Sequence, residues 1–406
     1  MSETETYVVV GAGHAGGRAV EAMRGAGFTG KIILIGDEPH LPYERPPLSK
    51  DLLQGRPEAH TPVREDTFYA ENDIDCRLGR RATALDPAGK TVTLDDGNSV
   101  SYDKLLLATG GAVRRLALPG TDLANIHYLR TLDDSRAIQG GLGDGKRVVV
   151  VGGGFIGLEV AASVRQQKCA VTVLEMADRL MGRAVLPEIS AAFLGLHTDR
   201  GVDIRLNTGI ASFEGDGSVS HAITGDGQKI SADIAVIGVG IIPETALAED
   251  AGLAVDNGIV VDEFGRTSAP DVYAAGDVTN HLNPLYGRHL RLESWQNAQN
   301  QAIAAAKTMC GDVQAYSEVP WMWSDQFDAN LQVAGMPERW DRVVFRGDPA
   351  STDFIGFQMA GDRLVGAMSV NRPRDMRVAR RLIGGDKALD DAALADESVS
   401  MRDLMR

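Results

Sequence analysis

Cysteine is scarce in this chain of 406 residues. The three cysteines, Cys76, Cys169 and Cys310, lie far apart, and none belongs to a CxxC pair or to a His/Cys cluster. We therefore expect no structural disulfide framework, no redox dithiol of neighbouring cysteines and no metal site. Each cysteine is better interpreted as a small buried hydrophobic residue.

The chain also lacks long hydrophobic runs and an excess of positive charge. No apolar run reaches the roughly 18 to 20 residues that a membrane span needs. The opening MSETETYVVV has neither the basic region nor the cleavage site of a signal peptide, so we expect a cytoplasmic protein. A formal net charge of −15 argues against binding to nucleic acid or anionic membranes. An acidic partner would need a local basic patch.

The chain does contain a strand-helix-strand pattern that occurs twice. The apolar run YVVVG predicts a strand, a small-residue helix follows from Ala15 to Ala26, and KIILIGDE predicts a second strand. The same order returns about 141 residues later with RVVVVG, a helix from about Ile156 to Gln167, and AVTVLEM. This spacing predicts βαβ units, parallel sheets and two copies of one domain.

Each copy carries a glycine loop between its first strand and its helix. Gly11, Gly13 and Gly16 fit GxGxxG, and so do Gly152, Gly154 and Gly157. In this context the glycines permit a tight turn, a close approach of the backbone to a pyrophosphate, and packing of helix on strand. A single such loop is weak evidence, because a plain strand-turn-helix can carry the same glycines.

An acidic residue follows each loop at the distance expected for a ribose contact. Asp37 lies 24 residues beyond Gly13, and Glu175 lies 21 beyond Gly154. Two complete sites predict two dinucleotides, one a tightly held flavin and the other an exchangeable nicotinamide. Because Glu175 would repel a 2′-phosphate and MADRL offers no immediate arginine pair, the second site should prefer NADH to NADPH.

The remaining segments predict hairpins and a further domain. The stretch GKTVTLDDGNSVSYDKLLLATGG has hairpin character, with a return strand ending near Thr109. From about Pro320 the sequence pattern changes to strand-like segments without a glycine loop, and a helical tail follows from about Arg374. We expect an α/β protein with two Rossmann-like domains and a C-terminal α+β domain. The expected bounds are 1–112 with 246–319, then 113–245, then 320–406.

Seven motifs together resemble those of one family. These are GAGHAG, PYERPPLSK, LLLATGG, VGGGFIGLEVA, DVYAAGDV, RLESWQNAQNQ and WMWSDQ. Over essentially its whole length the chain resembles the FAD-dependent NADH:ferredoxin reductases of bacterial oxygenase systems, which have the glutathione-reductase-like fold. The resemblance implies that the first loop holds FAD tightly but without a covalent bond, and that NADH comes and goes at the second.

The resemblance also implies individual roles. Lys50 would lie near the flavin ring and pair with Glu159 from the helix after the second loop, so that a positive group stabilises the charge that hydride brings. A solvated lysine and an ordinary helical glutamate are the alternative. The other implied FAD contacts are Ala15, Asp37, Arg45, Ala82, Thr109, Arg130, Asp277, Trp295 and Trp323, and the implied NAD contacts include Ile156, Glu175 and Gly240.

Alternatives exist for several of these contacts. Asp277 could cap a following helix, Arg130 could be a surface ion-pair residue, Trp295 could contribute only its backbone, and Trp323 could be a core tryptophan.

The electron acceptor is expected to be a one-electron carrier. Where related folds place a dithiol, this chain reads RPPLSKDLL, with Ser49 and no cysteine, which disfavours disulfide reductase and peroxidase chemistry. A flavin takes electrons as a hydride and releases them singly, so a small acidic iron–sulfur ferredoxin, or a rubredoxin, fits best. We expect a monomer or weak dimer. An NADH oxidase, or a redox-sensing interaction protein resembling apoptosis-inducing factor, are the competing functions.

Basic residues concentrate in two segments that could receive such a partner. RPRDMRVARRL places Arg374, Arg377 and Arg381 on one helix face, and GRHLRLE adds Arg288 and Arg291. They are candidates for docking an acidic ferredoxin. A solvated helix, partly ion-paired with Asp375 and Asp386, is the alternative.

Overall fold

The computed structural model describes residues 5–56 and 61–405. These residues divide into two compact units, each described by itself below. The first comprises Met1–Arg45, His60–Ala112 and Ile241–Pro320, and the second comprises Pro46–Ala59, Val113–Gly240 and Trp321–Arg406. Among the described helices, none is long and apolar enough to cross a membrane.

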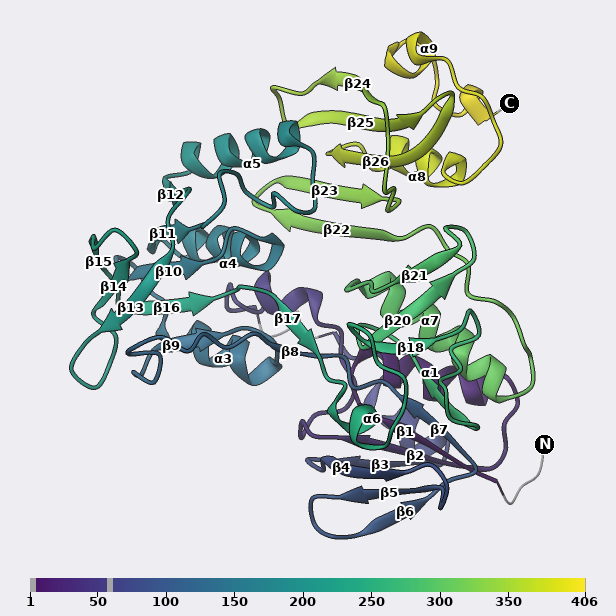
Figure 1. Cartoon of the computed structure of the whole chain (residues 1–406). Helices are drawn as coiled ribbons and strands as arrows, with labels where there is room; N and C mark the ends of the chain where they lie inside the picture. Colours follow the sequence, from purple (N-terminus) through teal and green to yellow (C-terminus); the bar gives the residue numbers. More distant parts are fainter. Residues whose placement is uncertain (1–4, 57–60, 406) are drawn as a thin grey trace. The chain divides into compact units, whose positions relative to one another are not determined.

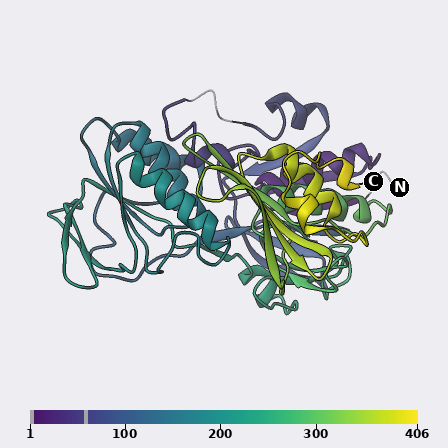
Figure 2. The ribbon, with the colours of Figure 1, turned by 90° about the horizontal axis from the view of Figure 1, so that it is seen from above.

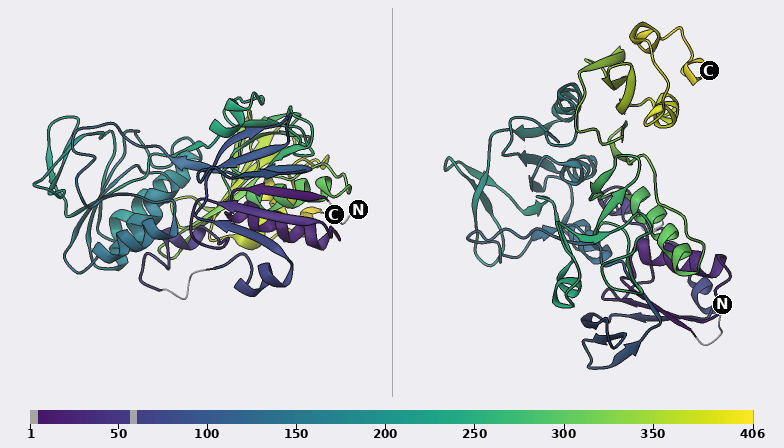
Figure 3. Two further views of the ribbon diagram at one scale, coloured as in Figure 1. Left: turned by 90° about the horizontal axis from the view of Figure 1, so that it is seen from below. Right: turned by 45° about the vertical axis from the view of Figure 1, so that its right-hand side comes forward.

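The first unit is built on a parallel sheet of five strands in the order β19-β7-β1-β2-β3. Figure 1 labels four of them, β1, β2, β3 and β7. The left view of Figure 3 shows its purple and blue strands side by side. The strands are β1 (Thr6–Val10), β2 (Lys31–Gly36), β3 (Ile74–Leu78), β7 (Lys104–Leu107) and β19 (Val272–Ala274), with helices α1 (His14–Gly25), α2 (Asp66–Glu71), α6 (Ala246–Asp250) and α7 (Trp295–Met309).

Alternation along β1 explains why both faces of this sheet are covered. Tyr7 and Val9 face a core that includes residues of α1 and α7. Val8 and Val10 face a second core beneath a small antiparallel sheet. The smaller strands of the unit are β4 (Ala82–Asp86), β5 (Thr91–Leu94), β6 (Ser99–Ser101), β18 (Ile259–Val261), β20 (Thr279–Asn283) and β21 (Arg288–Leu290), and the ladder of β8 (Gly111–Val113) with β17 (Ile241–Pro243).

The second unit repeats this architecture with a parallel sheet in the order β12-β11-β10-β16-β9. Each strand corresponds in place to one of the first sheet, so the duplication read from the sequence is present in the fold. Its elements are β9 (Ile126–Tyr128), α3 (Leu132–Gly141), β10 (Arg147–Val151), α4 (Phe155–Gln166), β11 (Ala170–Leu174), α5 (Pro187–Asp199), β12 (Val202–Arg205), β13 (Ile210–Glu214), β14 (His221–Thr224), β15 (Lys229–Ser231) and β16 (Ile234–Ile237).

The C-terminal part of the second unit is an antiparallel sheet in the order β22-β23-β26-β25-β24. Figure 2 shows the yellow C-terminal helices beside its yellow-green strands. Leu331, Phe354 and Val370 of this sheet share one core with Val148 and Val171 of the parallel sheet. The elements are β22 (Trp321–Gln326), β23 (Ala329–Ala334), β24 (Arg342–Asp348), β25 (Asp353–Ala360), β26 (Arg363–Val370), α8 (Pro373–Leu382), α9 (Asp391–Ala395) and η3 (Asp403–Met405).

Two features differ from the sequence expectations. The hairpin ends with β6, and the following β7 instead joins the central parallel sheet, because Leu105 to Leu107 are buried on both faces. The segment Pro46–Ala59, which contains the short helix η1 (Pro46–Ser49), groups with the second unit. Ser135 and Ser163 donate hydrogen bonds to carbonyls of this segment.

Candidate functional site

The first glycine loop joins β1 to α1 and leaves an open helix end. Gly11 has a φ of 114°, and a Cβ there would lie 2.2 Å from the Ala108 carbonyl oxygen, so any side chain is excluded. A Cβ on Gly13 would instead lie 3.7 Å from Arg45 Nη2, its nearest neighbour among the described residues. Gly13 is the N-cap of α1, and no described side chain caps that end. Open backbone N–H groups at a helix N-terminus suit a pyrophosphate.

The second loop reproduces this geometry between β10 and α4. Gly152 has a φ of 109°, and its Cβ would lie 2.4 Å from the Gly238 carbonyl oxygen. At Gly154, the N-cap of α4, a Cβ would meet no described atom within 4 Å, and no described side chain caps the helix. Ile156 in the first turn is 49% exposed. The chain therefore has two loops that fit a dinucleotide phosphate.

The two predicted ribose acids are held differently. Glu175 directly follows β11 and accepts hydrogen bonds from the Gly153 N–H at 2.7 Å and the Ala177 N–H at 2.8 Å. Its carboxylate is therefore fixed beside the second loop. Asp37 directly follows β2, and its exposed carboxylate pairs with Arg81 at 2.8 Å.

Glu38 is a residue of the first unit that the sequence analysis missed. Its Oε1 lies 2.7 Å from Arg45 Nη2, and its Oε2 accepts a hydrogen bond of 2.5 Å from the Tyr43 hydroxyl. Arg45, one of the implied FAD contacts, is thus held by the acid next to Asp37. The available signal was the pair of consecutive acids in GDE.

His14, the first residue of α1, was missed as well. Its ring is buried, lies 5.2 Å from the Trp295 ring between centroids, and has no hydrogen bond to any described residue. Burial, with help from Arg18 and Arg45, lowers the pKa of His14 to about 3. A neutral imidazole beside an open phosphate-type loop retains one N–H for a bound group, which supports a cofactor site in this unit.

The turn after β19 brings Asp277 to the same loop. A Cβ on Gly276 would lie 3.2 Å from the Ala15 Cβ, so this turn packs on α1. Gln301 on α7 holds the turn, because its Oε1 accepts hydrogen bonds from the Gly276 N–H and the Thr279 hydroxyl. Strand β20 follows Asp277, so the proposed role as a helix cap does not apply.

The other predicted residues are divided between the two units. Thr109 donates a hydrogen bond of 2.8 Å to the Glu244 carbonyl, and Ala82 begins β4. The first unit contains Gly11, Gly13, Ala15, Gly16, Asp37, Arg45, Ala82, Thr109, Asp277 and Trp295; the second contains Lys50, Arg130, Trp323 and all six predicted NAD residues, among them Gly157 and Gly240.

Lys50 and Glu159 meet inside the second unit. Lys50 Nζ lies 3.3 Å from Glu159 Oε1 and 3.7 Å from an oxygen of Asp325, and it sits 5.7 Å from the centre of the Trp323 ring. Glu159 is 4% exposed. Burial raises the pKa of the Glu159 carboxyl, while Lys50, Ser49 and Ser324 each oppose that rise. Both residues are therefore fixed partners in a buried environment.

A family model described as pyridine nucleotide-disulphide oxidoreductase matches residues 5–302. The chain belongs to this oxidoreductase family. A second model, described as the reductase C-terminal region, matches residues 321–405 of the oxidoreductase. The resemblance and the fold class predicted from the sequence are thereby confirmed.

Relatives of this oxidoreductase match it over nearly its full length. It is 46% identical to the anthranilate 1,2-dioxygenase system ferredoxin–NAD(+) reductase component of Burkholderia cepacia, over 98% of each chain. It is 38% identical to putidaredoxin reductase CamA of Pseudomonas putida, over 100% of this chain and 98% of that one.

Solved structures of ferredoxin reductases also match the oxidoreductase over nearly its full length. The oxidoreductase matches a covalent putidaredoxin reductase–putidaredoxin complex with a TM-score of 0.96 and 38% identity, covering 100% of this chain and 99% of that one. It matches the ferredoxin reductase for the CYP199A2 system from Rhodopseudomonas palustris with a TM-score of 0.94 and 38% identity, covering 98% and 99%.

Proposed function

We propose that this protein is an NADH-dependent flavoprotein reductase. It passes electrons from NADH through FAD, one at a time, to an iron–sulfur ferredoxin or rubredoxin that feeds a cytochrome P450 or a ring-hydroxylating oxygenase. The observation that carries the proposal is the pair of open glycine loops on two sheets of the same strand order. The relatives, named as ferredoxin reductases of dioxygenase and putidaredoxin systems, support the acceptor.

The family and its relatives imply the use of a flavin and NAD(H). We assign FAD to the first loop, held tightly and without a covalent bond, and an exchangeable NADH to the second. Bound FAD supplies hydride acceptance and single-electron release. The helix N-termini at Gly13 and Gly154 bind the pyrophosphates, and Glu175 binds a ribose and disfavours a 2′-phosphate. The protein is a cytoplasmic monomer or weak dimer. Its FAD-binding domain comprises 1–112 with 246–319, without the segment Pro46–Ala59, which groups with the second unit. Its NAD-binding domain comprises 113–245, and its C-terminal domain comprises 320–406.

Lys50 supplies the positive charge that favours negative charge arriving on a bound flavin, and Glu159 fixes the position of the Lys50 ammonium. A disulfide acceptor does not fit, because the residue beside this pair is Ser49. Its hydroxyl donates a hydrogen bond of 2.5 Å to Glu159 Oε2. We infer that electrons leave instead to an external carrier, and the ferredoxin reductases among the relatives support a one-electron carrier.

One assay tests this function. The purified yellow protein is mixed with NADH or NADPH, with and without a ferredoxin, while cytochrome c reduction and oxygen uptake are followed. We expect cytochrome c reduction that depends on the ferredoxin and on NADH, with NADPH at least about tenfold less effective, as the charge on Glu175 requires. Rapid oxygen uptake without a ferredoxin requirement would identify an oxidase instead. Equal use of NADPH would refute the role of Glu175.

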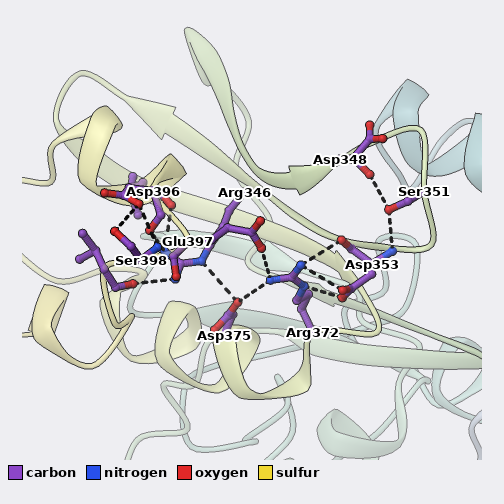
Figure 4. Close-up of polar contacts among 11 residues, drawn as sticks. Arg346, Asp348, Ser351, Asp353, Arg372, Asp375, Asp396, Glu397 and Ser398 are labelled. Carbon is purple, nitrogen blue, oxygen red and sulfur yellow. Dashed lines mark hydrogen bonds and ion pairs between the residues drawn. The ribbon is translucent and has the colours of Figure 1, made fainter.

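Helix α8 carries the arginines that we assign to ferredoxin docking. Arg374, Arg377 and Arg381 are exposed, while Met376, Ala379 and Leu382 face the sheet. No described acidic residue forms an ion pair with these three arginines. Asp375 is instead engaged by Arg346 and Arg372 (Figure 4), and Asp386 pairs with Arg363. The positive face of α8 is therefore not neutralised by the two acids considered from the sequence.

The other two predicted docking residues lie in the first unit. Arg291 forms an ion pair with Glu293, and Arg288 lies 6.0 Å from the centre of the Tyr286 ring. Their part in docking stays a prediction, and α8 is the stronger candidate because its charges are exposed.

Reversing two charges on α8 should weaken ferredoxin use. In Arg374→Glu/Arg377→Glu, we expect kcat/KM for the ferredoxin to fall about tenfold at low salt, because charge at an interface rim mainly sets the association rate. The difference should shrink as salt rises. Ferredoxin-dependent cytochrome c reduction measures it.

Two controls separate docking from general damage. Reduction of ferricyanide by NADH should stay at the wild-type rate, since this small acceptor needs no docking surface. Arg136→Glu, an exposed charge reversal on α3, should have less effect on ferredoxin use than Arg374→Glu. Unchanged ferredoxin kinetics in the double variant would rule out this face.

A further inference from the structure

A chain of buried polar side chains leads away from Glu159 into the C-terminal sheet. The Ser324 hydroxyl lies 2.7 Å from Glu159 Oε1, and Gln326 Nε2 lies 3.0 Å from Ser324 Oγ. His197 Nε2 on α5 lies 2.9 Å from Gln326 Oε1. Ser324, Gln326 and His197 are each 0% exposed. This hydrogen-bond chain of side chains therefore connects α4, β22 and α5 without reaching solvent.

Strand geometry explains how β22 contributes two consecutive members. Ser324 and Gln326 are two residues apart, so their side chains point to the same face of the sheet. The intervening Asp325 is half-buried and reaches Lys50 and the Trp323 indole N–H. Strand β22 thus contacts Glu159 through Ser324 on one face, and it contacts Lys50 through Asp325 on the opposite face.

The direction of every hydrogen bond in the chain follows from the carboxylate at its end. When Glu159 is ionised its carboxylate only accepts, so Ser324 must then use its single proton on Glu159 Oε1. Ser324 Oγ then has to accept from the Gln326 amide nitrogen, which turns the Gln326 carbonyl oxygen toward His197. That oxygen also only accepts, so His197 must carry its proton on Nε2. All three bonds donate toward Glu159.

The state of His197 agrees with this direction. Burial, reinforced by Arg200, lowers the pKa of His197 to about 4, so the ring is neutral near pH 7. A neutral ring has one N–H, and Nδ1 has no hydrogen-bond partner among the described residues. The proton therefore resides where the Gln326 carbonyl can accept it.

We propose that His197, Gln326 and Ser324 form a hydrogen-bond chain of positioning residues that favours the ionised form of Glu159 against the effect of burial and fixes its carboxylate against Lys50. The donors that converge on Glu159 are Ser324 at one oxygen and Ser49 at the other, with Lys50 as the facing cation. Of the charged neighbours, Asp325 faces Lys50 and Arg200 lies beside His197. Bonds to an ionised acceptor are the strong ones. The relevance to catalysis rests on the function proposed above, whereas the effect on Glu159 does not.

The experiment measures protonation of Glu159 directly. Infrared spectra of the purified holoprotein are recorded across a pH series, and the carbonyl stretch of protonated Glu159 is identified as the band that Glu159→Gln removes. In Ser324→Ala we expect the pH of half-protonation to rise by about one unit, a tenfold change, because a charge-assisted hydrogen bond is lost. In Ser324→Thr, which keeps the hydroxyl, it should stay close to the wild-type value.

Two further variants complete the test. Gln326→Leu removes the amide that donates to Ser324 without adding a charge, so it should also raise the pH of half-protonation of Glu159. Ser369→Ala removes a hydroxyl that is equally buried in the same sheet but is not part of this hydrogen-bond chain. It should leave the pH of half-protonation of Glu159 unchanged.

The proposal would be overturned if the pH of half-protonation of Glu159 did not shift in Ser324→Ala. It would also be overturned if folded Ser324→Thr showed the same shift as Ser324→Ala. If Ser324→Ala does not fold, Gln326→Leu decides. A raised pH of half-protonation of Glu159 supports the hydrogen-bond chain, and an unchanged one overturns it. The ferredoxin assay on the same samples does not depend on the infrared titration. A failure of the proposed function can therefore be told apart from a failure of the proposed hydrogen-bond chain.

Discussion

Lys50→Met is expected to slow reduction of the bound flavin by NADH by about 100-fold, because it removes a preorganised charge while keeping the length of the side chain. The Lys50 ammonium lies 3.3 Å from Glu159 and 5.7 Å from the centre of the Trp323 ring. Methionine fills a similar space without charge. Anaerobic stopped-flow measurement of flavin bleaching by NADH gives the rate.

A double variant separates the charge from its structural consequences. Leaving Glu159 buried without its cation costs on the order of 3–5 kcal/mol, so Lys50→Met should also lower the melting temperature. Lys50→Met/Glu159→Gln removes both charges and should recover much of that stability but not the rate. A single variant that reduces at the wild-type rate would exclude Lys50 from hydride transfer.

Gly13→Ala should yield a folded protein that no longer retains FAD. The backbone at Gly13 has a φ of −83°, which alanine adopts readily, and the nearest described atom to a Cβ would be 3.7 Å away. The methyl group would instead occupy the space through which a pyrophosphate approaches the helix end. We expect FAD affinity to fall by about 100-fold or more, the loss of roughly two hydrogen bonds to charged groups. The flavin-to-protein absorbance ratio and circular dichroism measure the two properties.

Matched glycine variants test the reasoning at each position. Gly154→Ala makes the same change in the second loop, where it should leave FAD bound and raise the KM for NADH. Gly11→Ala should damage the fold itself, because its φ of 114° and the 2.2 Å approach to the Ala108 carbonyl exclude a Cβ. If Gly13→Ala purified with full flavin, the first loop would not be the FAD site.

Local pattern was enough to predict the parts of the fold that depend on neighbours in sequence. The two glycine loops, their strands and helices, and the acids after the second strands all follow from spacing within about 40 residues, the size of a βαβ unit. The same reasoning overextended the hairpin, because only the complete sheet shows that Leu105 to Leu107 are buried on both faces.

Long-range contacts were beyond that reasoning. Ser324 is 165 residues from Glu159, and Gln326 is 129 from His197. Nothing in WMWSDQ or in the helix around His197 marks these side chains as partners. Glu38 was missed for a different reason: two adjacent acids follow β2, and only the position of Arg45 shows which of them holds it.

The common core of the second unit has a consequence for how such proteins diverge and recombine. Leu331, Phe354 and Val370 of the C-terminal sheet pack with Val148 and Val171, and Ser324 contacts Glu159 across the same boundary. A C-terminal module transplanted from a relative would bring foreign side chains into both contacts at once. Recombination that keeps both contacts intact must therefore inherit residues 113–240 and 321–406 together. It must also inherit Pro46–Ala59, whose Ser49 and Lys50 contact Glu159, although the sequence between these segments belongs to the other unit.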